Sequence, residues 1–140
     1  MATATKTSSG PLVRAVYARL RAQITTINGL AVGVYGDVPQ GAALPYLTIE
    51  SMGTAWNTAG RAGEEAILSL HAYGGNGRTV DAMVDAAVAA LNGYGGLAVE
   101  GYIVFDRPLF ETTERGEDVV INNVLVLHRI PRFRVWLVEQ

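Results

Sequence analysis

Two histidines, His71 and His128, supply the only imidazole groups of the chain. Each lies in a stretch that reads as a β-strand. Together they could bind a metal ion or act as a catalytic pair, because imidazole serves both purposes near neutral pH. No carboxylate or second ligand lies at a spacing from either residue that is typical of metal-binding or catalytic motifs, and no nucleophile elbow is present. We therefore interpret both histidines as ordinary strand residues.

A glycine-rich turn, Gly74-Gly75-Asn76-Gly77-Arg78-Thr79, stands between an expected strand and an expected helix, where phosphate-binding loops lie. The Gly-x-x-x-x-Gly-Lys-Ser/Thr spacing is absent, and the turn contains no lysine. No acidic strand end is available to hold magnesium. We interpret the turn as a flexible connection before a helix, and we expect no nucleotide, no other cofactor and no metal.

A group of carboxylates forms the densest negative segment of the chain, within DRPLFETTERGED. Its members are Glu111, Glu114, Glu117 and Asp118. A carboxylate pair that performs acid–base catalysis needs burial and defined geometry, which a loop containing threonine and glycine rarely supplies. We interpret the segment as a solvated loop and expect no catalytic residues in it.

Two other segments contain residue types suited to protein contacts. Trp56 stands among small residues in an expected loop, residues 52–63, and either packs on the core or contacts a partner. Pro39 and Pro45 stiffen the chain ahead of a strand that begins at Tyr46. Proline lowers the entropy of the free chain, so a stiff segment loses less on docking. The alternative is a well-defined loop that only delivers the strand.

The elements that position these residues follow from hydrophobic periodicity. One helix is expected to begin at Ser9-Gly10-Pro11, with Ser9 as its cap, and a second to cover about residues 79–92. Strands are expected over residues 30–35, 46–51, 64–73, 97–105 and 119–130, with 131–140 as a last strand or tail.

The expected strand VVINNVLVLHRI is apolar on both faces, and Leu125 and Leu127 lie on one of them. A strand that is apolar on both faces is covered on both sides. Because the chain offers only two helices, we expect a neighbouring subunit to supply part of this cover.

Composition narrows the class of protein. The chain has 140 residues, 49% hydrophobic and 17% charged, which suits one domain that is apolar for a soluble monomer. A net charge of −2 argues against a mainly electrostatic nucleic-acid binder, and the lack of cysteine excludes disulfides. No apolar run approaches the about 20 residues of a membrane span. We expect residues 1–10 to be a disordered arm and residues 11–140 a single domain.

A set of short motifs resembles a known family. They are the first helix LVRAVYARLRA; Val34-Tyr35-x-Asp37-Val38-Pro39 with Leu44-Pro45-Tyr46-Leu47-Thr48-Ile49; ILSLHAYGGNGRTVDAMVDAAVAALN; and VVINNVLVLHRI. Over roughly residues 11–130, their order is similar to that in the tail terminator, or tail completion, proteins of long-tailed bacteriophages. Many relatives carry tryptophan where His71 or Tyr73 stands here, and the segment after Ile130 has no counterpart that we can place.

The resemblance implies an α+β subunit with a mainly antiparallel sheet of about four to five strands flanked by two helices. It implies a structural virion protein and no enzyme: a homo-oligomeric ring, usually a hexamer, that caps the tail tube, ends tail polymerisation and joins the tail to the head connector. The implied partners are further copies of the chain, the tail tube protein and a head–tail connector or stopper protein. DNA passes through without specific binding, and no membrane is involved. The implied location is the head-proximal end of the virion tail, after assembly in the host cytoplasm.

This interpretation gives roles to the residues singled out above. The interface candidates are Trp56, Pro39, Pro45, Tyr46, Leu125 and Leu127. The channel-lining candidates are Glu111, Glu114, Glu117 and Asp118, whose alternative place is the outer rim of the ring. Another connector or minor tail protein, such as a stopper, would share the composition. A small hydrolase is the distant alternative, and a pocket containing both histidines would favour it.

Overall fold

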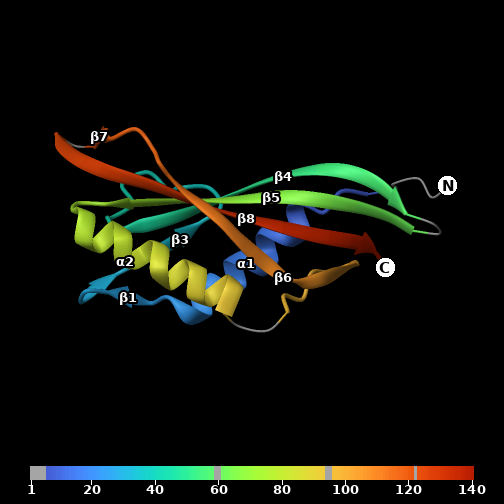
Figure 1. The fold of residues 1–140 in the computed structure, drawn as a ribbon. Coiled ribbons are helices and arrows are strands. Elements are labelled where there is room, and N and C mark those ends of the chain that lie inside the picture. The colour runs from blue at the N-terminus through green and yellow to red at the C-terminus, as the bar shows by residue number, and fades with distance from the viewer. Residues whose placement is uncertain (1–5, 59–60, 94–95, 122) are drawn as a thin grey trace.

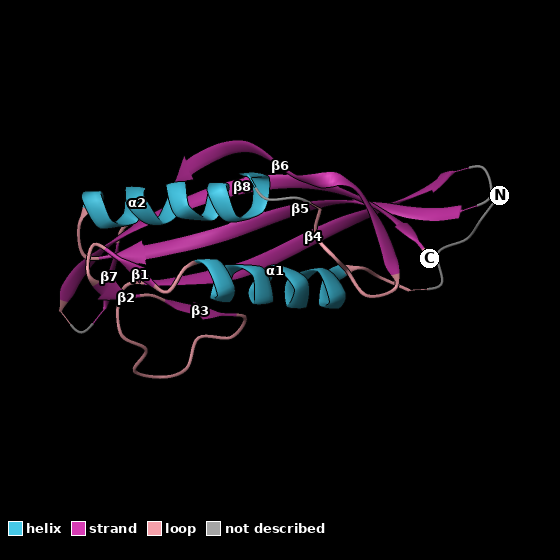
Figure 2. Cartoon of the chain, turned by 90° about the horizontal axis from the view of Figure 1, so that it is seen from below, coloured by secondary structure: helices cyan, strands magenta, loops and turns pink. Residues whose placement is uncertain are grey.

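One long, twisted sheet runs the length of the molecule and carries both helices on a single face (Figures 1 and 2). The computed structural model describes residues 6–58, 61–93, 96–121 and 123–140. The helices are α1 (Ser9–Gln23) and α2 (Gly77–Val88), the second continued by a short π-helical segment, η1 (Ala89–Gly93). The strands are β1 (Thr26–Ile27), β2 (Leu30–Ala31), β3 (Gly33–Tyr35), β4 (Tyr46–Thr58), β5 (Arg61–Gly74), β6 (Tyr102–Arg115), β7 (Val119–Ile121) and β8 (Val124–Glu139).

The main sheet has the strand order β3-β4-β5-β8-β6, and β7 pairs with the start of β8. All of its pairings are antiparallel except that of β3 with β4, which is parallel. This confirms the predicted α+β class with a mainly antiparallel sheet. The described sheet has six strands, and β1 and β2 form a separate pair, so the expected four to five strands were too few.

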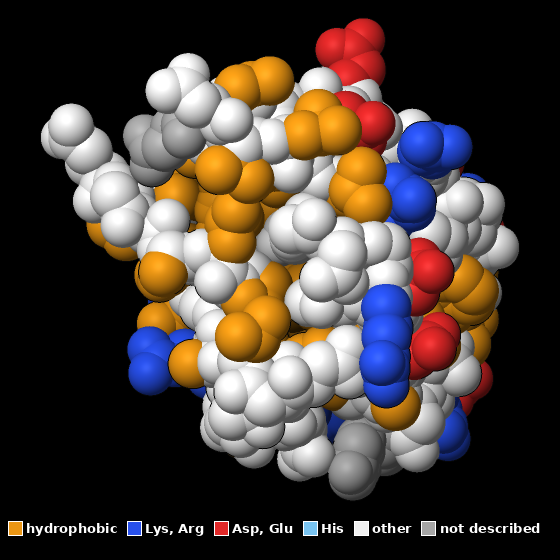
Figure 3. Space-filling model, turned by 90° about the vertical axis from the view of Figure 1, so that its left-hand side faces the viewer, with side chains coloured by type: hydrophobic (Ala, Val, Ile, Leu, Met, Phe, Trp, Pro, Cys, Tyr) orange, Lys and Arg blue, Asp and Glu red, His pale blue; other side chains and the backbone are white. Residues whose placement is uncertain are grey.

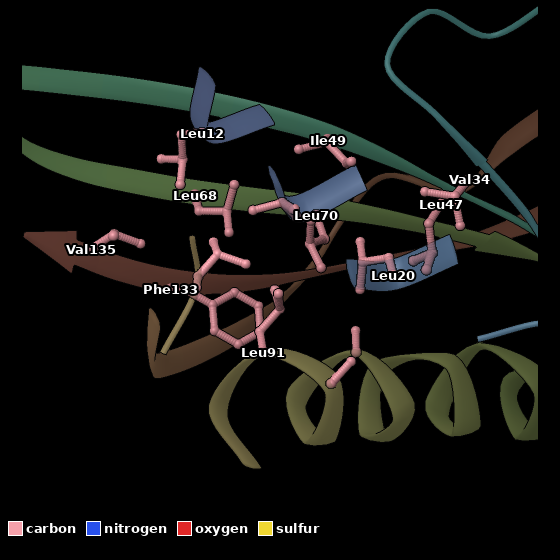
Figure 4. Packing of buried hydrophobic residues seen from close by; sticks show 14 of the residues in the cluster. Leu12, Leu20, Val34, Leu47, Ile49, Leu68, Leu70, Leu91, Phe133 and Val135 are labelled. Carbon is pink, nitrogen blue, oxygen red and sulfur yellow. The ribbon is translucent and has the colours of Figure 1, made fainter. Parts of the chain in front are cut away.

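The helix-covered face of the sheet forms the core. Side chains at alternate positions of β5 point to it, and all of them are fully buried: Ala66, Leu68, Leu70 and Ala72. They meet the apolar stripes of α1 and α2, which include Leu12, Leu20 and Met83. Each buried leucine contributes about 1.5–3 kcal/mol relative to exposure, so this face supplies most of the hydrophobic stabilisation. Figure 4 shows the cluster between sheet and helices.

The loop expected over residues 52–63 is wrong for its described part. Strands β4 and β5 continue through it as a long hairpin, with pairs from Met52↔Ile67 to Thr58↔Arg61. The small residues there have low strand propensity. Pairing with β5, which is itself paired with β8, outweighs that propensity.

The single strand expected over residues 119–130 is also wrong. The chain turns back within it, so that β7 pairs with the start of β8. Asn123 lies at the turn with φ of 65°, a left-handed conformation that asparagine tolerates better than most residues. The expected last strand or tail is the continuation of β8 to Glu139, and the expected strand over residues 97–105 begins only at Tyr102.

The first helix begins at Ser9 and is preceded by a different cap from the one expected. Ser8 occupies the cap position without a side-chain cap bond, because its hydroxyl contacts the buried carboxylate of Glu64. The Ser8 backbone N–H also donates to Glu64 Oε2 at 3.0 Å. Within the expected arm, Lys6 Nζ donates to the carbonyl oxygen of Gly101 at 2.9 Å. Residues 1–5 lie outside the described residues.

Candidate interaction surface

The β7–β8 hairpin projects beyond the body of the sheet. Strand β5 ends at Gly74, whose partner on β8 is Leu127, so the chain from Val119 to Val126 extends past the end of β5. Three of its apolar side chains are therefore poorly covered, whereas Val126 is fully buried. The exposed fractions are 69% for Val120, 52% for Val124 and 57% for Leu125. An apolar cluster of this exposure at one end of a molecule is typical of a contact surface.

The proline-containing loop before β4 lies beside this hairpin. Together they enclose a hollow of about 330 Å³, lined by Val38, Pro39, Gln40, Gly41, Ala42, Tyr46 and Ile121. We call the surface formed by this hollow, Val38, Val120, Val124 and Leu125 the hairpin end. Figure 3 looks onto it and shows hydrophobic side chains gathered on this face, with many of the charged side chains around its margin. Two segments far apart in the sequence thus build one apolar surface.

The structure brings some interface candidates together and separates others. Pro39 and Tyr46 line the hollow, although Tyr46 is only 8% exposed, and Leu125 is at the exposed hairpin. Leu127 packs against the core, and Pro45, which follows a cis peptide bond, is buried.

Trp56 lies apart from this surface. It pairs with Gly63 near the β4–β5 turn, at the opposite end of the sheet from the β7–β8 hairpin (Figure 1). Its side chain lies outside the described residues. The interface roles of Trp56 and of the other candidates stay predictions.

The two histidines meet on the open face of the sheet, which the helices do not cover. His71 Nδ1 and His128 Nε2 are 2.9 Å apart, and the His128 ring stacks on Tyr73 with a centroid distance of 4.3 Å. Glu50 Oε2 on β4 lies 3.5 Å from His71 Nε2. In the sequence the two histidines are 57 positions apart, and no spacing signal links them. The β5–β8 register, in which Tyr73 pairs with His128, brings them together.

Burial and the neighbouring His71 lower the pKa of His128 below its ordinary value. A neutral imidazole could act as a base, but nucleophilic catalysis needs a nucleophile within hydrogen-bond reach of that base. Among the described residues, no serine or threonine hydroxyl donates to either ring. The same part of the chain contains no group of three or more side chains that could hold a metal ion.

Comparison with known proteins decides the family. The model of the family described as tail completion protein gp17 matches residues 14–116. The chain belongs to the tail completion protein gp17 family. It is therefore a structural protein of a phage virion tail. A search of curated proteins finds no match.

The fold has a counterpart in a solved particle. A chain in the virion of a native gene transfer agent particle superposes with a TM-score of 0.72 at 21% sequence identity. The superposition covers 94% of this chain and 96% of that chain. The family match ends at residue 116, before β7, whereas the structural similarity covers 94% of the chain, so the shared fold extends beyond the family match.

In this tail completion protein the glycine-rich turn has a local explanation. Asn76 Oδ1 accepts a hydrogen bond from the Thr79 backbone N–H at 2.9 Å and so caps α2. A Cβ atom at Gly74 would lie 2.7 Å from Val80 Cγ2, so the packing of α2 on β5 requires glycine there. Capping and packing account for Gly74, Asn76 and Thr79 without a phosphate ligand, and the absence of nucleotide binding stays a prediction.

The acidic segment is not the solvated loop that we expect from the sequence. Most of it is the edge strand β6, and two of its carboxylates pair with arginines of β8. Glu111 Oε2 lies 2.9 Å from Arg134 Nε, and Glu114 Oε2 lies 3.1 Å from Arg132 Nη2. Both pairs are partly exposed, and such pairs contribute about 0–1 kcal/mol each. Glu117 and Asp118 lie in the connection between β6 and β7 and are exposed.

Over the described ranges, no helix is long and apolar enough to span a bilayer.

Proposed function

We propose that the chain forms a homo-oligomeric ring, most simply a hexamer, that caps the tail tube, ends tail polymerisation and joins the tail to the head connector. Membership of the tail completion family is the observation that carries this proposal. The partners would be further copies of the chain, the tail tube protein and a connector or stopper protein. The ring would lie at the head-proximal end of the tail after assembly in the host cytoplasm.

The hairpin end supports a role in assembly. The side chains of Val120, Val124 and Leu125 are each more than half exposed, and the adjacent hollow offers a concave site. Burial of such side chains against a partner contributes about 25 cal/mol per Å² of apolar area. We infer that this end contacts another subunit or the tail tube when the ring assembles.

Electron microscopy of particles that lack the protein tests the proposed function. We expect tails of irregular length without heads, because nothing would stop tube growth or provide the head-docking surface. Adding back the purified protein should restore tails of uniform length, with extra density at the head-proximal end. Density at the distal end, or tails of normal length that only fail to retain DNA, would favour a minor tail or stopper protein instead.

The acidic segment is proposed to line the DNA channel, with Glu111, Glu114, Glu117 and Asp118 facing the axis. Carboxylates would repel DNA phosphates and keep passage smooth, whereas cationic contacts release counterions and bind DNA. Pairing with arginine offsets the charges of Glu111 and Glu114. No lysine or arginine among the described residues lies within ion-pair distance of Glu117 or Asp118. These two carboxylates therefore allow the cleaner test.

Replacing Glu117 and Asp118 together with lysine is expected to slow DNA ejection several-fold, most strongly at low ionic strength, because each new phosphate contact is salt-dependent. The rate of DNA release from assembled particles is the measurement. A control that replaces Asp81 and Asp85, both exposed on α2, makes the same change of charge elsewhere. Normal ejection by the first variant, or equal slowing by both, would contradict the channel assignment.

A further inference from the structure

The β7–β8 hairpin leaves the body of the sheet at His128. The pair Tyr73↔His128 is followed by Gly74↔Leu127, the last pair that β5 makes with β8. On the other side of β8, the last pair with β6 is Arg115↔Arg129. Beyond these points β8 pairs only with β7. The contacts of His128 therefore stand at the base of the hairpin that carries the exposed apolar residues.

The His128 ring is held between β5 and the connection that leads into β7. On one side it contacts His71 at 2.9 Å and stacks on Tyr73. On the other side lies Gly116, where an added Cβ atom would come within 2.1 Å of His128 Nδ1. The Gly116 backbone N–H also donates to the His128 carbonyl oxygen at 3.0 Å. Because no side chain separates the ring from the Gly116 backbone, a ring pushed away from His71 presses on that backbone.

The contact between the two rings depends on their protons. A hydrogen bond between two imidazole nitrogens needs one of them as a neutral acceptor. When both rings are protonated, two N–H groups face each other and two positive charges stand close together, which is unfavourable. The 2.9 Å contact is therefore compatible with two neutral rings or with one neutral and one protonated ring. It is not compatible with two protonated rings.

Groups on each neighbouring element act on this balance. Glu50 Oε2 on β4 lies 3.5 Å from His71 Nε2 and so places a carboxylate beside the pair. Burial and the charges of His71 and Arg129 oppose a proton on His128, whereas a hydrogen bond to the Glu117 backbone and the charge of Asp118 favour it. Burial raises the pKa of Tyr73 above 10.0, so its hydroxyl stays neutral. The second proton is thus the one that the folded structure resists.

We propose that the His71–His128 contact is a proton-operated latch at the base of the β7–β8 hairpin. It is closed while at least one ring is neutral, and it opens when both rings are protonated. Opening moves the Gly116 connection and loosens β7, which changes the shape of the hairpin end. The latch is a property of the single subunit and does not depend on assembly of the oligomeric ring.

The direction of the pH effect follows from linkage. The pKa of His128 is lowered from 6.5 in the folded chain, first by burial and then by His71. The unfolded or opened state therefore binds the proton more readily than the closed state. The contribution of the latch to stability is complete at a pH above the ordinary pKa of histidine. It is lost as the pH falls through the lower pKa that His128 has in the folded chain.

Amide hydrogen exchange of the full chain at two pH values tests the latch. On lowering the pH from about 7.5 to about 5, we expect protection of amides 119–126 to fall several-fold more than that of the β4–β5 amides, after correction for the intrinsic exchange rate. His71→Gln keeps a hydrogen-bonding partner for His128 but cannot be protonated, so this difference should disappear. A flat response in the natural chain, or the same response in His71→Gln, would overturn the proposal.

Nuclear magnetic resonance titration of the natural chain keeps the proposal testable if His71→Gln does not fold. The chain has only 2 histidines, so every imidazole signal comes from this pair. We expect the rings to titrate in separate steps, with shifts of the hairpin amides accompanying the step at lower pH. Two independent titrations near the ordinary value, with unmoved hairpin amides, would sink the idea.

Discussion

A single glutamate in place of Leu125 is expected to abolish incorporation of the protein into tails and to leave the subunit folded. Leu125 is 57% exposed in the subunit, so the new carboxylate remains in water there and costs little. In an assembled interface the same carboxylate would be buried without a partner. That penalty is several kcal/mol, and about 3 kcal/mol already weakens association more than a hundredfold. Complementation of particles that lack the protein measures the effect.

Met52→Glu is the matched control for Leu125→Glu. Met52 is 66% exposed and lies on β4, away from the hairpin end, so the substitution also places a carboxylate on exposed apolar surface. We expect this control to be incorporated into tails. Both variants should have the same midpoint of thermal unfolding as the natural chain. Normal incorporation of Leu125→Glu, or equal failure of both variants, would remove the hairpin end as the specific contact surface.

Elements with strong hydrophobic periodicity could be predicted from the sequence. Residues alternate along the expected strand over residues 64–73, and in β5 this alternation places Leu68 and Leu70 in the core. The apolar stripe of α2 includes Val80 and Met83, and both are fully buried. Such patterns are local. The apolar face is buried whichever element covers it, so the pattern alone indicates which side points inward.

Strand ends and turns were predicted less well, because they depend on pairing between distant segments. β4 continues past Ser51 because its partner β5 continues too, and the small residues between them carry no strand signal of their own. For the β7–β8 turn a signal was available. The two asparagines of VVINNVLVL, between apolar runs, are typical of a turn, and they outweigh the apolar pattern that favoured a single strand.

The surroundings of the candidate residues depend on sheet register, which the sequence does not specify directly. His71 and His128 meet because Tyr73 pairs with His128 and because alternate residues of a strand share a face. Arg132 and Arg134 alternate along β8 and face the carboxylates of β6 for the same reason. The alternating arginines were a usable signal for a charged neighbouring strand, but only the pairing shows which carboxylates they meet.

Phe133→Ala is expected to produce the largest loss of stability of any substitution described here. The Phe133 side chain is fully buried where β8 faces Leu91 of η1 (Figure 4). Its ring also makes an edge contact with Phe110, at a centroid distance of 5.7 Å. Removing a buried phenylalanine ring costs the transfer free energy of the ring and leaves a cavity, together about 3–5 kcal/mol.

That loss is large against the about 5–15 kcal/mol that stabilises a typical domain, so the melting temperature should fall by more than about 10 °C. Phe110→Ala is the matched control, because it removes the other ring of the same contact from a position that is 39% exposed. Its cost should be clearly smaller, since solvent already reaches part of the ring and less of a cavity remains. Denaturant unfolding measures the free energy of unfolding of both variants, provided that its dependence on denaturant concentration is unchanged. Equal losses would mean that the centre of the core does not lie at Phe133.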